Sequence, residues 1–232
     1  MLAVSPSRNR LLAALSRADL ALLQPHLKHG PLKLRQELEW PNRHIDYVYF
    51  PDRGIASVVA VQANDTRVEV GLIGSEGMTG TSILLGSRTP HSTYIQVAGE
   101  GQRIGALKLR QAMDASKSLR MLFLRYVQAF MVQTAHTAIS NARSRLDARL
   151  ARWLLMAHDR VRDETLPLTH EFLSLMLGVR RAGVTEALHS LESQKLIYTG
   201  TRKVALRNRK GLERVAGSSY GTPEAEFQRL IS

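Results

Sequence analysis

Two arginines, Arg180 and Arg181, precede a stretch with the residue spacing of a helix. A guanidinium can donate two parallel hydrogen bonds to the major-groove edge of a guanine, which is worth about 1–3 kcal/mol of discrimination between bases. Thr185, Glu186 and His189 follow on the same predicted helical face. These residue types favour recognition of DNA bases and phosphates by a helix that lies in the major groove.

Residues 168–193 predict two helices joined by a short turn. Thr169 can cap the first helix, and Glu171 lies in its first turn, where a carboxylate suits the helix dipole. Gly178 stands where the first helix should end, because glycine tolerates a left-handed backbone. The second helix, over residues 180–193, is expected to face the core with Val184, Ala187, Leu188 and Leu191.

A short hairpin is predicted directly after these helices, with Gly200 in its turn. Basic residues crowd this region: Lys195, Arg202, Lys203, Arg207, Arg209, Lys210 and Arg214. A run of positive charge is often only a solvated face, but beside a recognition helix it favours phosphate contacts. The segment predicts a winged helix-turn-helix, with DNA contacts expected from Thr169, Arg180, Arg181, Thr185, His189, Arg202 and Lys203.

The composition agrees with an anionic partner. The 232 residues carry a formal net charge of +12, which favours nucleic acid first and an anionic membrane surface second. There is no cysteine, so disulfides, thiolate zinc sites and cysteine-ligated iron–sulfur clusters are excluded. No apolar run approaches the ~20 residues that span a membrane, and the N-terminus lacks a signal-peptide core. We therefore expect a cytoplasmic protein without a membrane partner.

The N-terminal half has a different sequence pattern. Residues 1–28 are expected to be helical as far as Pro25. Short β-rich runs then alternate with turn residues, at 32–40, 45–50, 55–62, 67–73, 93–97 and 103–107, and residues 63–66 form a good hairpin turn. Many short strands of this kind predict a barrel, roll or sandwich.

A long helical stretch is expected from about residue 107 through 159, with a hinge near 141–145. A stripe of residues recurs there at intervals of three or four: Leu119, Leu122, Tyr126, Phe130 (or Ala129), Gln133 and Thr137. We expect this predicted dimer stripe to pair two chains, since helix-turn-helix proteins commonly read two-fold DNA sites. The alternative is that the stripe packs on its own β domain.

Catalytic or metal chemistry finds little support. The glycine-rich run at residues 74–80 could present backbone N–H groups to a phosphate, but it matches neither common phosphate-binding pattern and favours a tight β turn. His26 and His29 have no third ligand nearby, and His170-Glu171 lacks the second histidine of a zinc-protease motif. We expect neither a metal site nor an enzyme.

The order of predicted elements resembles the Crp/Fnr family of bacterial transcription regulators over nearly the whole chain. The resemblance rests on residues 70–80 (VGLIGSEGMTG), 147–151 (DARLA) and 168–197. It implies an α+β fold with a jelly-roll-like β-roll sensor domain at residues 1–115, a dimerisation helix and hinge at 116–146, and a winged helix-turn-helix at 147–232. It also implies a homodimer that binds palindromic promoter DNA, with RNA polymerase and a small-molecule effector as further candidate partners.

The effector pocket departs from the cyclic-AMP-binding members of that family. Their Gly-Glu-Leu and Arg-Ser/Thr-Ala steps correspond here to Gly80-Thr81-Ser82 and His91-Ser92-Thr93, and Arg88 is the nearest guanidinium. Without the carboxylate for the ribose and the arginine for the phosphate, cyclic AMP is not expected to bind. The candidate effector pocket is Gly80, Thr81, Ser82, Arg88, His91 and Ser92, and the effector stays unidentified.

The recognition helix departs as well. Arg181 matches the arginine that reads guanine in the family, but Ala182 replaces the usual glutamate and Glu186 stands at a basic position. We therefore expect an altered operator. The alternative is a β-roll protein that senses a small molecule or a partner and binds DNA weakly or not at all.

Overall fold

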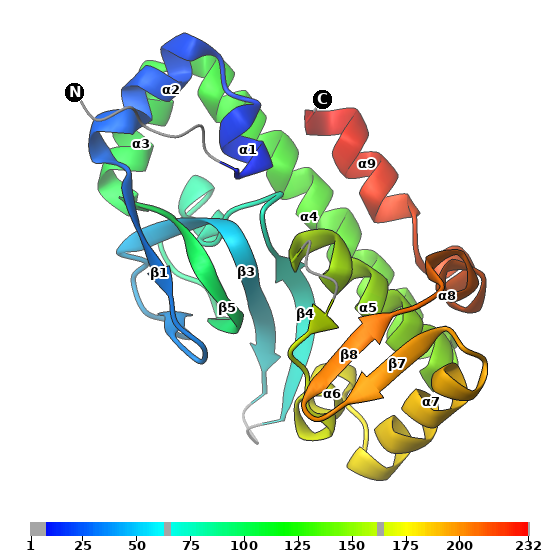
Figure 1. The fold of residues 1–232 in the computed structure, drawn as a ribbon. Helices are drawn as coiled ribbons and strands as arrows, with labels where there is room; N and C mark the ends of the chain where they lie inside the picture. The colour runs from blue at the N-terminus through cyan, green and yellow to red at the C-terminus, as the bar shows by residue number, and fades with distance from the viewer. Residues whose placement is uncertain (1–7, 63–65, 162–164, 232) are drawn as a thin grey trace.

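The computed structural model describes residues 8–62, 66–161 and 165–231, and Figure 1 shows their arrangement. The N-terminal part contains α1 (Arg10–Ala13), α2 (Arg17–Leu23), β1 (Lys28–Leu32), β2 (Glu37–Glu39), β3 (Tyr47–Val61), β4 (Arg67–Ile73), β5 (Ser92–Gly105) and α3 (Ala106–Ala115). Two 3₁₀ turns, η1 (Gln24–His26) and η2 (Thr81–Leu84), lie between them. The long helix α4 (Lys117–Arg143) follows.

The C-terminal part begins with α5 (Leu146–Val161) and β6 (Thr165–Leu166). It continues with α6 (His170–Leu177), α7 (Arg181–Ser193), β7 (Ile197–Gly200), β8 (Lys203–Leu206), α8 (Arg209–Ala216), η3 (Gly217–Ser219) and α9 (Thr222–Ile231). The chain is thus an antiparallel sheet domain, a long helix and a helix-rich head with a three-stranded sheet, β6-β8-β7, which confirms the predicted α+β class.

The N-terminal sheet has the strand order β1-β5-β3-β4, with β2 also paired to β5. Its strands are fewer and longer than predicted, because the runs at 45–50 and 55–62 are one bent strand and those at 93–97 and 103–107 are another. The bend in β3 falls at Gly54 (φ 92°), where a Cβ atom would lie 2.6 Å from the Val97 carbonyl oxygen. The run at 32–40 is instead divided by a turn at Leu34-Arg35, and residues 63–65 of the predicted hairpin turn lie outside the described residues.

Serine residues divide the helical segments. Residues 1–7 of the predicted helix over residues 1–28 lie outside the described residues, and the remainder contains two short helices, with Ser16 capping α2 through the Asp19 N–H. Ser116 likewise ends α3 and caps α4 by accepting the Leu119 N–H, so the long predicted stretch contains a break there. The second break, between Arg143 and Leu146, falls in the predicted hinge region.

The inner face of α4 packs on the chain's own sheet domain, which corrects the predicted dimer stripe. Leu119 is fully buried, and the Tyr126 hydroxyl donates to the Met78 carbonyl oxygen at 3.2 Å. Gln133 accepts from the Leu72 N–H at 2.7 Å and donates to the Leu72 carbonyl at 3.2 Å. Leu72 belongs to the edge strand β4, whose free backbone groups need partners. The remaining stripe residues, Leu122, Phe130 and Thr137, are also partly buried.

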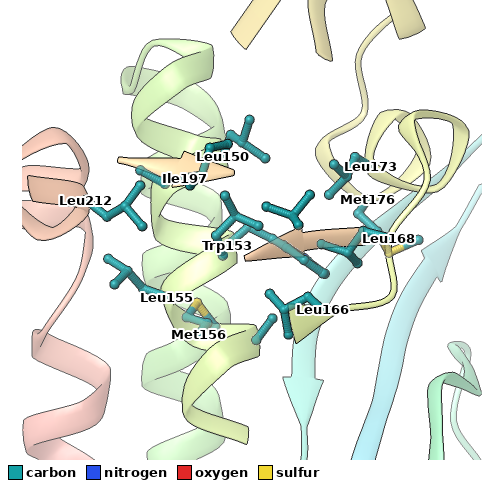
Figure 2. Close-up of a cluster of buried hydrophobic side chains, with 14 of the residues drawn as sticks. Leu150, Trp153, Leu155, Met156, Leu166, Leu168, Leu173, Met176, Ile197 and Leu212 are labelled. Atoms are coloured by element: carbon teal, nitrogen blue, oxygen red, sulfur yellow. The ribbon is translucent and has the colours of Figure 1, made fainter. Parts of the chain in front are cut away.

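Helix α5 lies at the centre of the helix-rich head. Figure 2 shows Leu150 and Trp153 of α5 among Leu173 and Met176 of α6, with Ile197 and Leu212 arriving from β7 and α8. The Trp153 ring also meets the Phe172 ring edge-on, with the ring centroids 6.0 Å apart. Burial of such apolar side chains contributes about 1.5–3 kcal/mol each, so α5 is the main support of the head.

The same helix is tied to the sheet domain by a buried carboxylate. Glu69 on β4 accepts hydrogen bonds from Trp153 Nε1 at 2.7 Å, from Ser57 Oγ at 2.6 Å and from Gln96 Nε2 at 3.3 Å. Burial raises the pKa of Glu69 to about 7, although its three donors and the nearby Arg152 oppose the rise. The junction between sheet and head therefore contains a carboxyl group that titrates near neutral pH.

The last helix, α9, was not predicted. It leaves the head and runs back along α4 to the N-terminal helices (Figure 1), where Ile231 packs in the same cluster as Leu11 and Leu119. Arg10 lies over the Phe227 ring, 4.8 Å from its centroid, and donates to Gln228 at 3.1 Å. The two ends of the described chain are thus packed together.

The raised pKa of Glu69 predicts a pH-dependent stability. The folded state holds this proton more tightly than the unfolded chain, whose glutamates titrate near pH 4.5, so its contribution to stability is full below pH 4.5 and is lost as pH rises through 7. We expect Glu69→Gln to flatten the fall in Tm between pH 5 and 8, as measured by calorimetry. The exposed Glu100→Gln is the matched control, and a Glu69→Gln profile parallel to that of the control would contradict the prediction.

Candidate nucleic-acid interface

The first helix of the predicted motif is capped as its sequence indicates. Thr169 accepts the Phe172 N–H at its side-chain oxygen, 3.1 Å away, and Glu171 lies in the first turn. Gly178 ends the helix in a left-handed conformation (φ 62°), and the next N–H, that of Val179, donates to the Ser174 carbonyl. These local signals fix the angle at which the chain enters the second helix.

Helix α7 begins at Arg181, with Arg180 as the capping residue. Its inner side chains are buried as predicted: Val184, Ala187, Leu188 and Leu191. Its outer face exposes Arg180, Arg181, Glu186 and His189. The first turn of the helix therefore presents two guanidinium groups to solvent, at the end of the helix that reaches bases in helix-turn-helix proteins.

Thr185 differs from these residues, because it connects the two helices. Its hydroxyl donates to the Arg181 carbonyl at 3.1 Å and lies 2.9 Å from Nδ1 of His170 on α6. The side chain is half-buried. The structure thus gives Thr185 a local bridging contact, and it brings in His170, which sequence reasoning did not place in the site.

The wing consists of β7 and β8, with Gly200 paired to Lys203 across the turn. Arg202 at the tip has a left-handed backbone (φ 54°), and both Arg202 and Lys203 are exposed. The carboxylate of Glu192 near the end of α7 accepts the Thr199 N–H and hydroxyl, each at 2.7 Å. These hydrogen bonds lower the pKa of Glu192 and hold the wing against the recognition helix. Sequence reasoning missed Glu192 in this position.

The six candidate effector residues lie at η2, in the loop after it and at the start of β5, and they make separate contacts. Arg88 is exposed and its Nη2 atom lies 3.0 Å from Nε2 of His44, while Ser92 donates to Glu37 at 3.0 Å. The Gly80 N–H donates to the buried carboxylate of Glu39 at 2.8 Å. Thr81 and Ser82 form part of η2, and burial lowers the pKa of the half-buried His91.

The glycine-rich run is explained by packing. A Cβ atom on Gly74 would lie 2.5 Å from Cβ of Arg160, and one on Gly77 would lie 2.1 Å from the Tyr126 hydroxyl. Glu76 between them makes an ion pair with Arg160 Nε at 2.8 Å. The glycines therefore make room for side chains of α4 and α5, and the loop forms a second attachment of α5 to the sheet domain.

Within residues 8–62, 66–161 and 165–231, no three histidine or acidic side chains lie close enough together to hold a metal ion. None of the described helices combines the length and the apolar character needed to cross a membrane.

Residues 148–215 match the family model of the Crp-like helix-turn-helix domain. This match covers α6, α7 and the wing, and it confirms the predicted motif and its resemblance to the Crp/Fnr regulators. No curated protein is significantly similar to the chain in sequence.

Solved structures share the fold over most of the chain. FixK2 from Bradyrhizobium japonicum superposes with a TM-score of 0.72 at 16% identity, covering 82% of this chain and 98% of its own. The c-di-GMP-responsive global regulator CLP from Xanthomonas campestris gives a TM-score of 0.66 at 17% identity, covering 82% of this chain and 99% of its own. A CRP-family transcriptional regulator from Thermus thermophilus gives a TM-score of 0.67 at 20% identity, covering 81% of this chain and 96% of its own.

The close approach of Tyr126 to Gly77 predicts that a side chain at position 77 destabilises the protein. We expect Gly77→Ala to destabilise the protein by about 1–3 kcal/mol, because the methyl group would overlap the buried Tyr126 ring. Gly86→Ala is the control, since its Cβ atom would meet nothing nearer than 3.7 Å. Denaturant unfolding measures both variants, and equal stabilities for the two would show that the packing explanation is wrong.

Proposed function

We propose that this chain, which has the fold of the Crp/Fnr regulators and carries a Crp-like helix-turn-helix domain, is a homodimeric, sequence-specific DNA-binding transcription regulator. The observation that carries the proposal is the exposed N-terminus of α7, where the capping residue Arg180 and the first residue Arg181 are both exposed. The residue match over 148–215 agrees with it.

In this proposal α7 enters the major groove and the wing lies along the phosphate backbone. Arg181 reads a guanine through its two parallel N–H donors, and His189 lies further along the same exposed face. Thr169, Arg180, Arg202 and Lys203 contact phosphates, which fixes the register of the helix on the duplex. Thr185 contributes mainly by joining α7 to His170, so the recognition surface is held rigid.

The outer face of α4 is the proposed dimer interface. It consists of Met121, Leu124, Gln128, Met131, Ala135 and Ala138, which recur at alternating intervals of three and four. Met131 is 59% exposed and Met121 is 51% exposed, although both are large apolar side chains. A heptad stripe of this kind suits a parallel pair of helices, and a second copy of this chain would cover it. The pair would present two α7 helices to one two-fold DNA site.

We propose an effector other than a cyclic nucleotide. The buried Glu39 carboxylate already accepts the Gly80 N–H, and the exposed Arg88 interacts with His44, which disfavours a cyclic phosphate held by Arg88. A regulator of this kind acts on chromosomal DNA, which places it in the cytoplasm, and RNA polymerase is then a natural partner.

The proposal is tested by retention of genomic DNA fragments. At ~0.1 M salt, a sequence-specific regulator should enrich particular fragments over random DNA. Enrichment of none would overturn the proposal and favour the alternative of a sensing protein with lost DNA binding.

Two variants separate base reading from phosphate contact on an enriched fragment. We expect Arg181→Ala to reduce the binding free energy by about 1–3 kcal/mol on that fragment and to change it little on random duplex, because the substitution removes a base contact. Arg202→Ala should weaken binding to both duplexes alike. It should also reduce the slope of log binding constant against log salt concentration by about one. Fluorescence anisotropy over a salt series measures these effects, with the exposed Lys108→Ala as control. Equal losses on both duplexes for Arg181→Ala would refute its role.

A negative charge placed on the outer face of α4 tests the proposed dimer interface. We expect Met131→Glu to convert the dimer into a monomer of 25.9 kDa, since two carboxylates would meet across the two-fold axis. Light scattering coupled to gel filtration gives the mass. Leu85→Glu is the control, because Leu85 is 79% exposed but lies outside α4. A Met131→Glu protein that keeps the wild-type dimer mass would contradict the assignment.

A further inference from the structure

A large groove lies between the sheet domain and the first helix of the helix-turn-helix. Its volume is about 1110 Å³. One wall is the Leu34-Arg35 turn with the neighbouring parts of β4 and β5, and the other is α6 with the turn that leads to Arg180. The groove is separate from the six candidate effector residues, none of which lines it. It is large enough for an organic ligand of ordinary size.

Exposed apolar side chains line both walls of this groove. Leu34 is 61% exposed on the sheet side, and Leu175 is 41% exposed on α6. Tyr94 and Phe172 add aromatic surface to the same lining. An apolar ligand body would remove this surface from water, at about 25 cal/mol for each Å² buried.

The charged lining favours an anion. Arg35 and Arg180 both line the groove, and within the described residues neither guanidinium has a hydrogen-bond or ion-pair partner. Arg35 also has a left-handed backbone (φ 63°), a conformation that costs about 1–3 kcal/mol for a residue with a side chain. The lining contains Glu37 as well, but its carboxylate accepts the Ser92 hydroxyl, and Glu171 lies in the first turn of α6 near the positive end of the helix dipole.

A buried polar atom adds a second requirement. Gln96 lines the groove with only 4% of its surface exposed, and its Nε2 atom donates to Glu69. Its Oε1 atom has no hydrogen-bond partner within the described residues. An unsatisfied buried acceptor costs about 1–3 kcal/mol, so a ligand with an N–H or O–H donor would gain from binding here.

We propose that this groove binds a small organic acid with an apolar body and one N–H or O–H donor. The carboxylate lies between Arg35 and Arg180, the body covers Leu34 and Leu175, and the donor reaches Gln96. Because Arg180 is also a proposed phosphate contact, the acid and DNA compete for it, and the acid lowers DNA affinity. This last step rests on the proposed function, and the binding of the acid itself does not.

Ligand-observed NMR and calorimetry on the full chain test the site with three probes: indole-3-acetate, 4-hydroxycinnamate and 10-hydroxydecanoate. We expect at least one to bind, with its uncharged amide bound about tenfold more weakly because a charge-assisted hydrogen bond is lost. For indole-3-acetate, methylation of the ring nitrogen should also weaken binding severalfold. Binding of none of the three acids at millimolar concentration would overturn the proposal.

Matched variants locate the binding. Arg35→Gln and Leu175→Ser should each weaken the bound acid about tenfold, since they remove one charge contact and one apolar wall. Arg43→Gln and Leu85→Ser are the controls, being exposed residues that do not line the groove. Thermal unfolding of all four variants checks that each is folded. Unchanged affinity in both groove variants would overturn the proposed site.

DNA binding with and without the acid separates this inference from the proposed function. A fall in affinity for an enriched fragment, absent in Arg35→Gln, supports the competition. A protein that binds an acid through Arg35 but no DNA keeps the site and overturns the proposed function. A protein that binds DNA with the same affinity at saturating acid overturns the competition.

Discussion

Two carboxylates on the sheet domain hold helix α5, and the position of the whole head depends on this attachment. Glu69 binds Trp153, and Glu76 binds Arg160 seven residues further along the helix, so both contacts lie on one helical face. Buried charged contacts of this kind contribute less to stability than to geometry, because desolvation offsets much of their attraction. Their importance is that they fix where α7 points. Since the chain is not helical at Ser144 and Arg145, these contacts restrict rotation of the head about that break.

The helix-turn-helix could be predicted from sequence because its signals are local. The Thr169 cap, the left-handed Gly178 and the apolar spacing of α7 each act within a few residues, and the structure contains all three. The bend of β3 at Gly54 could not be predicted in the same way, because its cause is the close approach of β5, more than forty residues away in the chain.

The orientation of α4 shows the same limit. This helix has apolar side chains on two faces, and residue spacing alone cannot decide which face the chain itself covers. The decision is made by distant groups, such as the Leu72 backbone that Gln133 satisfies and the Met78 carbonyl that accepts from Tyr126. This limit affects the candidate DNA-binding site less, because its arginines are exposed whichever way α4 is turned. What sequence reasoning missed were the connecting residues His170 and Glu192, whose partners are known only from the fold.

The contact between Arg10 and Gln228 joins residues 218 positions apart, and α9 completes a core that begins at Leu11. Because α9 is synthesised after the head, the packing of the N-terminal core is completed only after the head has been made. The buried cluster of the head contains residues 150–216 together with Ile55, Leu72 and Val97 of the sheet domain, so all of its parts are synthesised before α9. The order of synthesis thus favours a head that packs before α9 covers the N-terminal core.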